Sequence, residues 1–272
     1  MSYLRQLREM PLLKDARNFQ ILFQSAFLLY GIWALDWEAD IYRFATLMGV
    51  CLMTQFIGAL ITKAPMHSLK SALITSLGLS LLFKSNSYLT LALAAFLAIG
   101  GKFVFRHQQK HVFNPANFGI VATILLTGDG WVSPGQWGSQ VILLFFIGAA
   151  GLMVLLRCGR VDTSLAFIGT LFLLEFSRTV LYQGWGMDVL MHKFTNGSLL
   201  LFTFFMITDP VTTPNAPSAR LIWAALIATV TFFLGTKFQV HTAPVWALFF
   251  ISPITPLFDR LLKGKKFEWI HA

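Results

Sequence analysis

The sequence predicts an all-α integral membrane protein with about ten transmembrane helices. Composition is the first reason: of the 272 residues, 56% are apolar and only 12% are charged, whereas a soluble domain carries about 25% charged residues. The mean hydropathy of +0.67 is the second reason. The third is that Lys and Arg lie in the short loops between apolar runs, a pattern typical of membrane topology. We therefore expect the lipid bilayer as partner and no binding of nucleic acid.

The apolar runs, taken in order, give the individual spans. A helix needs roughly 20 apolar residues to cross the hydrocarbon core of a bilayer. Seven runs are long enough: 18–35, 42–62, 86–105, 139–157, 162–183, 218–236 and 243–263. Three further runs are shorter or begin with helix-start signals: 68–84, 114–127 and 196–208.

The start positions of these runs pair across the chain at a nearly constant spacing: 18 with 139, 42 with 162, 68 with 196, 86 with 218, and 114 with 243. This pairing predicts two five-helix repeats, 18–127 and 139–263, between an N-terminal segment 1–17 and a C-terminal tail 264–272. Because five is odd, the second repeat must cross the membrane in the opposite direction. Inverted repeats of this kind are typical of transporters, whose binding sites lie between the repeats.

The distribution of charge and of tryptophan sets the expected orientation. Most Lys and Arg residues fall in loops on the side of both termini, so both termini are expected in the cytoplasm. The opposite loops carry Asp36, Glu38 and Asp40. Four tryptophans are expected to form an aromatic belt at the membrane interface: Trp131, Trp137, Trp185 and Trp269. The N-terminus carries no pattern of a cleaved signal peptide.

The short run at 196–208 is the main candidate for a central site. Asn196 is a good N-cap, and the run ends at Thr208-Asp209-Pro210, where proline bars helical geometry at the residue before it. A short helix at membrane depth is viable only if its ends face protein, water or ligand. Asp209 could ligate a cation together with the Thr208 or Thr212 hydroxyl. Alternatively, Asp209 only caps the break.

Asn114-Pro115-Ala116-Asn117-Phe118-Gly119 is a second helix-start signal, with Asn as the N-cap and Pro at the first helical position. One interpretation is an ordinary helix entry at the membrane surface. The other is that free backbone N–H groups at this terminus face an anion or an electron-rich ring, helped by the helix dipole.

Two charged residues fall inside the expected span 162–183. Glu175 and Arg178 are three residues apart and share a helix face. They are either a mutually neutralising pair or, with Asp209, part of an ion pathway in which Glu175 titrates. His111 and His241 precede helix starts at matching points of the two repeats. We expect them to be interfacial anchors and expect no metal site, because no ligand cluster surrounds them.

Several segments together resemble the RnfD/NqrB family, the membrane subunits of ion-translocating ferredoxin:NAD and NADH:quinone oxidoreductases. The most specific block is Phe204-Phe205-Met206-Ile207-Thr208-Asp209-Pro210-Val211-Thr212. It is preceded by Asn196-Gly197-Ser198-Leu199-Leu200 and followed by Arg220-Leu221-Ile222 and Pro256-Leu257-Phe258-Asp259. The Asn114 to Gly119 segment also matches the family's Asn-Pro-Ala entry. The resemblance covers roughly residues 40–266.

The resemblance implies a fold similar to urea and ammonium channels, a location in the bacterial inner membrane, and flavin. Family members carry FMN esterified to a Thr in a long loop between the fifth and sixth helices. Here only Gly128 to Gly138 occupies that place, without the Ser-Gly-Ala-Thr motif, so we expect no covalent FMN. The shortened loop resembles that of stand-alone relatives of the UnbU type. A noncovalent flavin (FMN or riboflavin) or quinone is the expected cofactor, with these candidate residues: Asn114, Asn117, Gly119, Gly197, Ser198, Thr208, Asp209 and Thr212.

The leading functional hypothesis is a membrane subunit for electron transport coupled to ion movement, working with other membrane electron-transfer subunits. No P-loop, dinucleotide fingerprint or Ser-His-Asp set occurs in the sequence, so the chain is at most a non-autonomous part of an oxidoreductase. The competing hypothesis is a stand-alone channel or transporter for a small solute, such as a flavin or a secondary metabolite. A third is a structural scaffold for a membrane complex.

Overall fold

The structure of the chain, a computed structural model, describes residues 15–63, 65, 68–108, 110–133, 137 and 141–268. Helices dominate these residues, and the only strands among them are four two-residue pieces. The prediction of an all-α protein is confirmed. The expected positions of Trp269, of residues 1–14 and of most of the 134–140 loop lie outside the described residues.

The first part of the chain forms a group of five helices, close to the expected boundaries. They are α3 (Ala16–Ala34), α4 (Ile41–Thr62), α5 (Leu69–Leu82), α6 (Tyr88–Val104) and α7 (Pro115–Thr127). Most begin at a side-chain N-cap that satisfies a free backbone N–H of the first turn. The capping oxygens belong to Asp15, Asp40, Ser87 and Asn114.

The second part forms another helical group. Its members are α8 (Val141–Cys158), α9 (Val161–Phe176), α10 (Met187–Phe194), α11 (Gly197–Leu201), α12 (Pro217–Lys237), α13 (Ala243–Ile251) and α14 (Thr255–Leu261). Two of the helices continue as π-helices, α9 into η3 (Ser177–Tyr182) and α11 into η4 (Phe202–Met206). Such π segments are frequent at functional sites.

The last expected span differs from the structure. The run 243–263 is not one helix, because it is divided into α13, the 3-10 turn η5 (Ser252–Ile254) and α14. Pro253 and Pro256 fall at these breaks. A proline lacks the N–H that would continue the α-helical ladder, and its ring clashes with the preceding turn. The short amphipathic α10 was also not expected from the sequence, which shows only a modest apolar pattern there.

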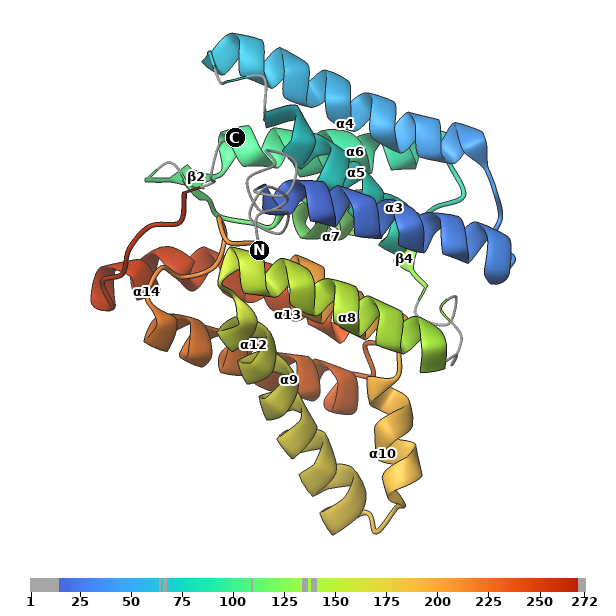
Figure 1. The fold of residues 1–272 in the computed structure, drawn as a ribbon, viewed down its shortest axis with the longest axis vertical. Coiled ribbons are helices and arrows are strands. Elements are labelled where there is room, and N and C mark those ends of the chain that lie inside the picture. The colour runs from blue at the N-terminus through green and yellow to red at the C-terminus, as the bar shows by residue number, and fades with distance from the viewer. Residues whose placement is uncertain are drawn as a thin grey trace, which may run out of the picture.

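The two helical groups pack against each other along α3 and α8, which lie side by side across the middle of Figure 1. In the first group α6 packs on α4 and α7, and α3 packs on α5. In the second group α12 packs on α9 and α13, and α11 packs on α8. A further contact joins α7 to α13. Two short helices, α5 and α11, end in the interior between the two groups.

Two short antiparallel ladders close the loops at opposite ends of the first group. β1 (Phe83–Lys84) pairs with β4 (Trp131–Val132), and β2 (Arg106–His107) pairs with β3 (Lys110–His111). Asp129 fastens the first ladder, because its carboxylate accepts hydrogen bonds from Ser85 (2.8 Å) and Thr90 (2.8 Å). The Ser85 bond and then the Thr90 bond lower the pKa of Asp129.

The helices are those of a membrane protein. Three helical segments are long and apolar enough to cross a bilayer: Ile41–Thr62, Val161–Tyr182 and Pro217–Lys237. Large apolar side chains remain exposed on the outer faces, as Met53, Ile57 and Ile61 do on α4. Such a row of exposed apolar side chains along one helix face is typical of a surface that contacts lipid or another protein.

The predicted aromatic belt stays a prediction for Trp131 and Trp185 and is wrong for Trp137. Trp131 and Trp185 are exposed, at 42% and 51% of their surface. Trp137 does not belong to an exposed belt, because it is 1% exposed and packs edge-on against Trp37 with the ring centroids 4.8 Å apart. Its ring also covers Gly197, where any Cβ would lie 2.6 Å from Trp137 Cγ. Trp137 is therefore part of the core.

Gly119 allows the close approach of α7 to α6. A Cβ at this position would lie 2.6 Å from the Ala94 carbonyl oxygen and 2.6 Å from the Ala98 Cβ. Both obstacles belong to a helix backbone or sit directly on it, so neither can move independently. We expect Gly119→Ala to destabilise the protein by about 1–3 kcal/mol, the usual cost of overpacking, measured as a lower melting temperature in detergent.

Gly100 on α6 provides the matched control for this prediction, because a Cβ there would meet nothing within 4 Å. Gly100→Ala is expected to leave the melting temperature unchanged or to raise it, since Ala is the better helix former by about 1 kcal/mol. If the two alanine variants melted alike, close α6–α7 packing at Gly119 would not limit stability.

Candidate functional site

A cavity of about 100 Å³ lies between the two helical groups. Its walls come from α3, α5, the start of α7, the end of η4 and the turn that follows η4. The polar lining residues are Arg17, Gln20, Gln24, Ser71, Thr75, His111, Asn114 and Asp209. Leu81, Leu82, Leu201, Phe205 and Met206 supply apolar wall. We call this space the central cavity.

Asp209 both caps the end of η4 and faces the central cavity. Its Oδ1 accepts a hydrogen bond from the Val211 N–H (3.1 Å), and its carbonyl oxygen accepts from the N–H groups of Thr212 and Thr213 (3.1 Å each). Its Oδ2 lies 3.7 Å from His111 Nε2, and the side chain is 16% exposed. Capping therefore uses one carboxylate oxygen and leaves the other directed at His111.

Asn114 connects the start of α7 to the same turn. Its Oδ1 accepts from the Asn117 N–H (3.1 Å), as an N-cap should. Its Nδ2 donates to the Met206 carbonyl oxygen (3.2 Å) and lies 3.5 Å from Asp209 Oδ2. The amide thus joins the beginning of a helix in one group to the end of a helix in the other, at the cavity wall.

Sequence reasoning missed the contribution of α3. Arg17, Gln20 and Gln24 all line the central cavity and are at most 7% exposed. Their spacing of three and four residues inside an apolar run places them on one helix face, and this spacing is the signal that could have revealed them. Gln24 Oε1 is buried and has no hydrogen-bond partner among the described residues, so it is an acceptor available to a ligand.

A buried lysine, Lys102, contacts a residue that lines the central cavity. Lys102 Nζ donates to Gln55 Oε1 (2.9 Å) and to Ser71 Oγ (3.0 Å), and Ser71 itself lines the cavity. Lys102 is 8% exposed. Ionisable side chains at this depth are expensive to bury, and they are by default candidates for a functional role.

The structure does not bring the other expected cofactor residues to the central cavity. Asn117 is buried and donates through Nδ2 to the Val245 carbonyl oxygen of α13 (2.7 Å). Thr208 Oγ1 donates to the Phe204 carbonyl oxygen (2.7 Å), and Thr212 Oγ1 to that of Asp209 (3.2 Å). Gly119 and Gly197, as described above, serve helix and ring packing. Ser198 lines a different cavity.

That second cavity has a volume of about 400 Å³ and is lined mainly by the second helical group, by α9, η3, α10, α11, η4, α12 and α13, with Leu82 and Val132 contributed by the first part of the chain. Both Glu175 and Arg178 line it. The expected Glu175–Arg178 pair is not formed, because Glu175 Oε2 instead takes Lys193 Nζ of α10 at 2.6 Å. The α10 helix was absent from the sequence-based expectation, so this partner could not be named.

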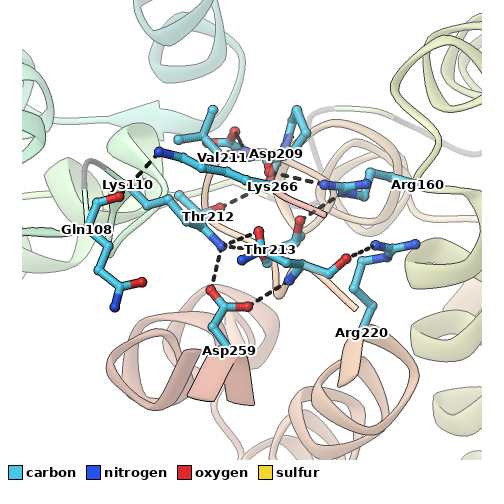
Figure 2. A network of polar contacts seen from close by, with 12 residues as sticks. Gln108, Lys110, Arg160, Asp209, Val211, Thr212, Thr213, Arg220, Asp259 and Lys266 are labelled. Carbon is cyan, nitrogen blue, oxygen red and sulfur yellow. Dashed lines mark hydrogen bonds and ion pairs between the residues drawn. The ribbon is translucent and has the colours of Figure 1, made fainter. Parts of the chain in front are cut away.

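A polar network fixes the turn after η4, as Figure 2 shows. Lys110 Nζ donates to the Thr213 carbonyl oxygen (2.8 Å) and pairs with Asp259 Oδ2 of α14 (2.8 Å). Arg160 donates to Thr213 Oγ1 (2.9 Å) and to the Pro210 carbonyl oxygen (3.2 Å). Burial lowers the pKa of Lys110, whereas the hydrogen bond and charge of Asp259 raise it. The network therefore holds the turn that carries Asp209 in place.

The two histidines lie in separate places, His111 at the central cavity and His241 at the second cavity. Within the described residues no three His, Cys, Asp or Glu side chains come together in a group that could hold a metal ion. The central cavity therefore offers one carboxylate, one imidazole, several amides and hydroxyls, and the guanidinium of Arg17, which is paired with Asp15 at 2.9 Å. Such a set can hold a proton and can form hydrogen bonds to the carbonyl or hydroxyl groups of a small ring.

Comparison with known proteins gives a consistent result. Residues 122–268 match the model of the NQR2, RnfD, RnfE family. The chain is similar to the RnfD subunit of the ion-translocating oxidoreductase complex of Shewanella frigidimarina, with 26% identity over 140 residues, which are 52% of this chain and 37% of the relative. The same protein of Shewanella loihica is 26% identical over 149 residues, 55% of this chain and 42% of the relative.

A shorter stretch is more similar to another relative. The corresponding RnfD protein of Stutzerimonas stutzeri is 33% identical over 73 residues, 27% of this chain and 21% of that relative. The chain thus spans less than half the length of the relatives it matches.

Proposed function

The chain belongs to the NQR2, RnfD, RnfE family, and from that premise we propose that it is a membrane subunit for electron transport coupled to ion movement. Its partners would be other membrane subunits of an ion-translocating oxidoreductase complex, in the bacterial inner membrane. The relatives named above are subunits of such a complex. On this proposal the chain is not an enzyme by itself.

We further propose that the two helical groups are inverted repeats with ten spans and with both termini in the cytoplasm. The packing supports this, because corresponding helices make corresponding contacts. The α4–α6 contact matches α9–α12, the α6–α7 contact matches α12–α13, and the α3–α5 contact matches α8–α11. The short helices α5 and α11, which correspond to the paired runs 68–84 and 196–208, both line the central cavity.

The central cavity is proposed to hold the expected noncovalent redox group, and its size favours a quinone ring over a flavin. Its volume of about 100 Å³ is well below the roughly 300 Å³ of the smallest usual ligand pockets. A cavity of about 150 Å³ takes up a single benzene ring, so the central cavity must widen to admit even one ring and would have to widen much further for a three-ring flavin. A quinone would supply two-electron, two-proton redox chemistry.

The residues around the cavity have defined roles in this proposal. The Asn114 amide is fixed by its two bonds and positions a carbonyl oxygen of the ring. The unpartnered Gln24 Oε1 accepts a hydrogen bond from a hydroxyl of the reduced ring. Asp209 and His111, 3.7 Å apart, hold the proton that moves with the electrons. Glu175 and Arg178 line the second cavity. Their part in an ion pathway, at the end opposite to the central cavity, stays a prediction.

The observation that carries the proposal is the meeting of Asn114 and Asp209 at the wall of one cavity between the two groups. The first experiment is a spectrum of the protein purified in mild detergent, before and after acid precipitation, with extraction of the pellet into organic solvent. We expect about one quinone per chain in the organic extract. Flavin released into the aqueous supernatant would replace quinone as the redox group, and flavin retained by the pellet would contradict the argument from the short loop.

A chain that releases neither group would overturn the redox assignment. In that case solute flux through liposomes containing the purified chain alone tests the competing transporter. The same preparation serves both measurements, so a negative spectrum leads directly to the second test.

A further inference from the structure

We propose that the second cavity is a binding site for a phosphate group that carries an apolar substituent, and that Arg178 is its main ligand. The proposal does not depend on the redox role of the central cavity. The volume of about 400 Å³ lies within the usual range of about 300–1,000 Å³ for small-molecule sites. A free phosphate ion would fill only a small part of this space.

The charges of the second cavity favour an anion. Arg178 and Lys193 line it together with a single carboxylate, that of Glu175. Lys193 neutralises Glu175 through the 2.6 Å ion pair. Arg178 makes no ion pair and no side-chain hydrogen bond within the described residues, so its positive charge is left over. A guanidinium presents a rigid fork of N–H donors that matches phosphate oxygens.

Two hydroxyl groups at the second cavity point to a polar ligand independently of the charge. Thr231 on α12 is 5% exposed and lines the cavity, yet its Oγ1 has no hydrogen-bond partner within the described residues. Ser198 Oγ, from the start of α11, is also buried at the cavity without a partner in the part of the chain that the structure describes. Leaving buried hydroxyls unsatisfied costs free energy. A ligand with several acceptor oxygens offers partners to these hydroxyls and to Arg178, and phosphate has more such oxygens than a carboxylate.

The remaining walls explain the apolar substituent. Leu171, Leu199, Phe202 and Val245 face the same space, and they gain nothing from a purely polar ligand. An amphiphilic phosphate places its charged end at Arg178 and its apolar part against these side chains. Such a ligand has two sources, an anionic membrane phospholipid and a soluble phosphate ester.

The test uses the full chain in an uncharged detergent and three probes measured by calorimetry. Dihexanoyl phosphatidate carries both the phosphate and the apolar chains, dihexanoylglycerol carries the chains alone, and glycerol 3-phosphate carries the phosphate alone. We expect saturable binding of the phosphatidate and none of dihexanoylglycerol. If glycerol 3-phosphate binds as tightly as the phosphatidate, the ligand is a soluble phosphate ester and the proposed role of the apolar substituent is overturned.

Single substitutions test which side chains bind the phosphatidate. Arg178→Gln should weaken phosphatidate binding roughly 10- to 100-fold, the effect of losing charge-assisted hydrogen bonds. Thr231→Val preserves shape and should weaken binding roughly 2- to 10-fold. Glu175→Gln removes the nearby negative charge and should strengthen it. Lys237→Gln, an exposed cation at the end of α12 that does not line the cavity, is the matched control and should change nothing.

Three further results would overturn the proposal: no binding of either phosphate probe, equal binding of dihexanoylglycerol and the phosphatidate, or unchanged binding by Arg178→Gln. Should Arg178→Gln fail to fold, Thr231→Val decides, because it alters one hydroxyl in an otherwise unchanged wall.

Discussion

Replacing Asp209 with asparagine is expected to reduce electron-driven ion uptake by membrane vesicles at least about tenfold while the protein stays folded in the membrane. Asparagine keeps an oxygen that can accept from the Val211 N–H, the bond that caps η4. It loses the negative charge that faces His111 at 3.7 Å and the ability to hold a proton. A tenfold loss corresponds to about 1.4 kcal/mol. This one substitution therefore tests the charge of Asp209 at the site while it keeps the cap on which the fold depends.

The control for Asp209→Asn is the same change at Asp188, an exposed residue of α10 that lines neither cavity. Asp188→Asn should retain full ion uptake. Both variants should be present in the membrane at the wild-type level, with melting temperatures close to that of the wild type. Full ion uptake by Asp209→Asn would remove this carboxylate from the proposed site.

Replacing Lys110 with methionine should cost about 3 kcal/mol of stability, because removing one partner of a buried ion pair leaves the other charge uncompensated. The Lys110 and Asp259 side chains are both 11% exposed. Methionine fills a similar volume without replacing the bonds to Asp259 and to the Thr213 carbonyl oxygen. The melting temperature in detergent should fall by about 6 to 12 °C.

A double-mutant cycle with Asp259→Leu distinguishes the pair from general loss of packing. Because the penalty of Lys110→Met arises from the unpaired carboxylate, adding Asp259→Leu should restore part of the lost stability. Strictly additive losses would mean that the pair itself contributes little. Ion uptake should also fall in Lys110→Met, since the network holds the turn that carries Asp209.

The sequence alone was sufficient to predict the structural role of a residue where that role depends on its nearest neighbours along the chain. Asn114 and Asn196 are N-caps at the expected helix starts, since a cap depends on backbone groups two or three residues away. Asp209 ends the short second-group segment for the same local reason. These local rules also placed the ends of most apolar runs within a few residues.

Features that depend on distant partners could not be read from the sequence. Glu175 pairs with Lys193, eighteen residues away on α10, instead of with its helix neighbour Arg178. Trp137 is in the core because Trp37 and Gly197 happen to surround it. The polar face of α3 was visible as a spacing, but only the packing of the two groups shows that it faces a cavity.

The amide of Asn117 has a mechanical consequence. It ties α7 to α13 through the 2.7 Å bond to the Val245 carbonyl oxygen, and Lys110 ties the β2–β3 hairpin to α14 at 2.8 Å. Rocking one helical group against the other would strain both the hydrogen bond and the ion pair. The α3 helix contacts α8 of the other group through packing and is tied to α5 of its own group by the ion pair between its N-cap Asp15 and Lys70. The contact between α7 and α13 is then the part of the interface that resists relative movement of the two groups.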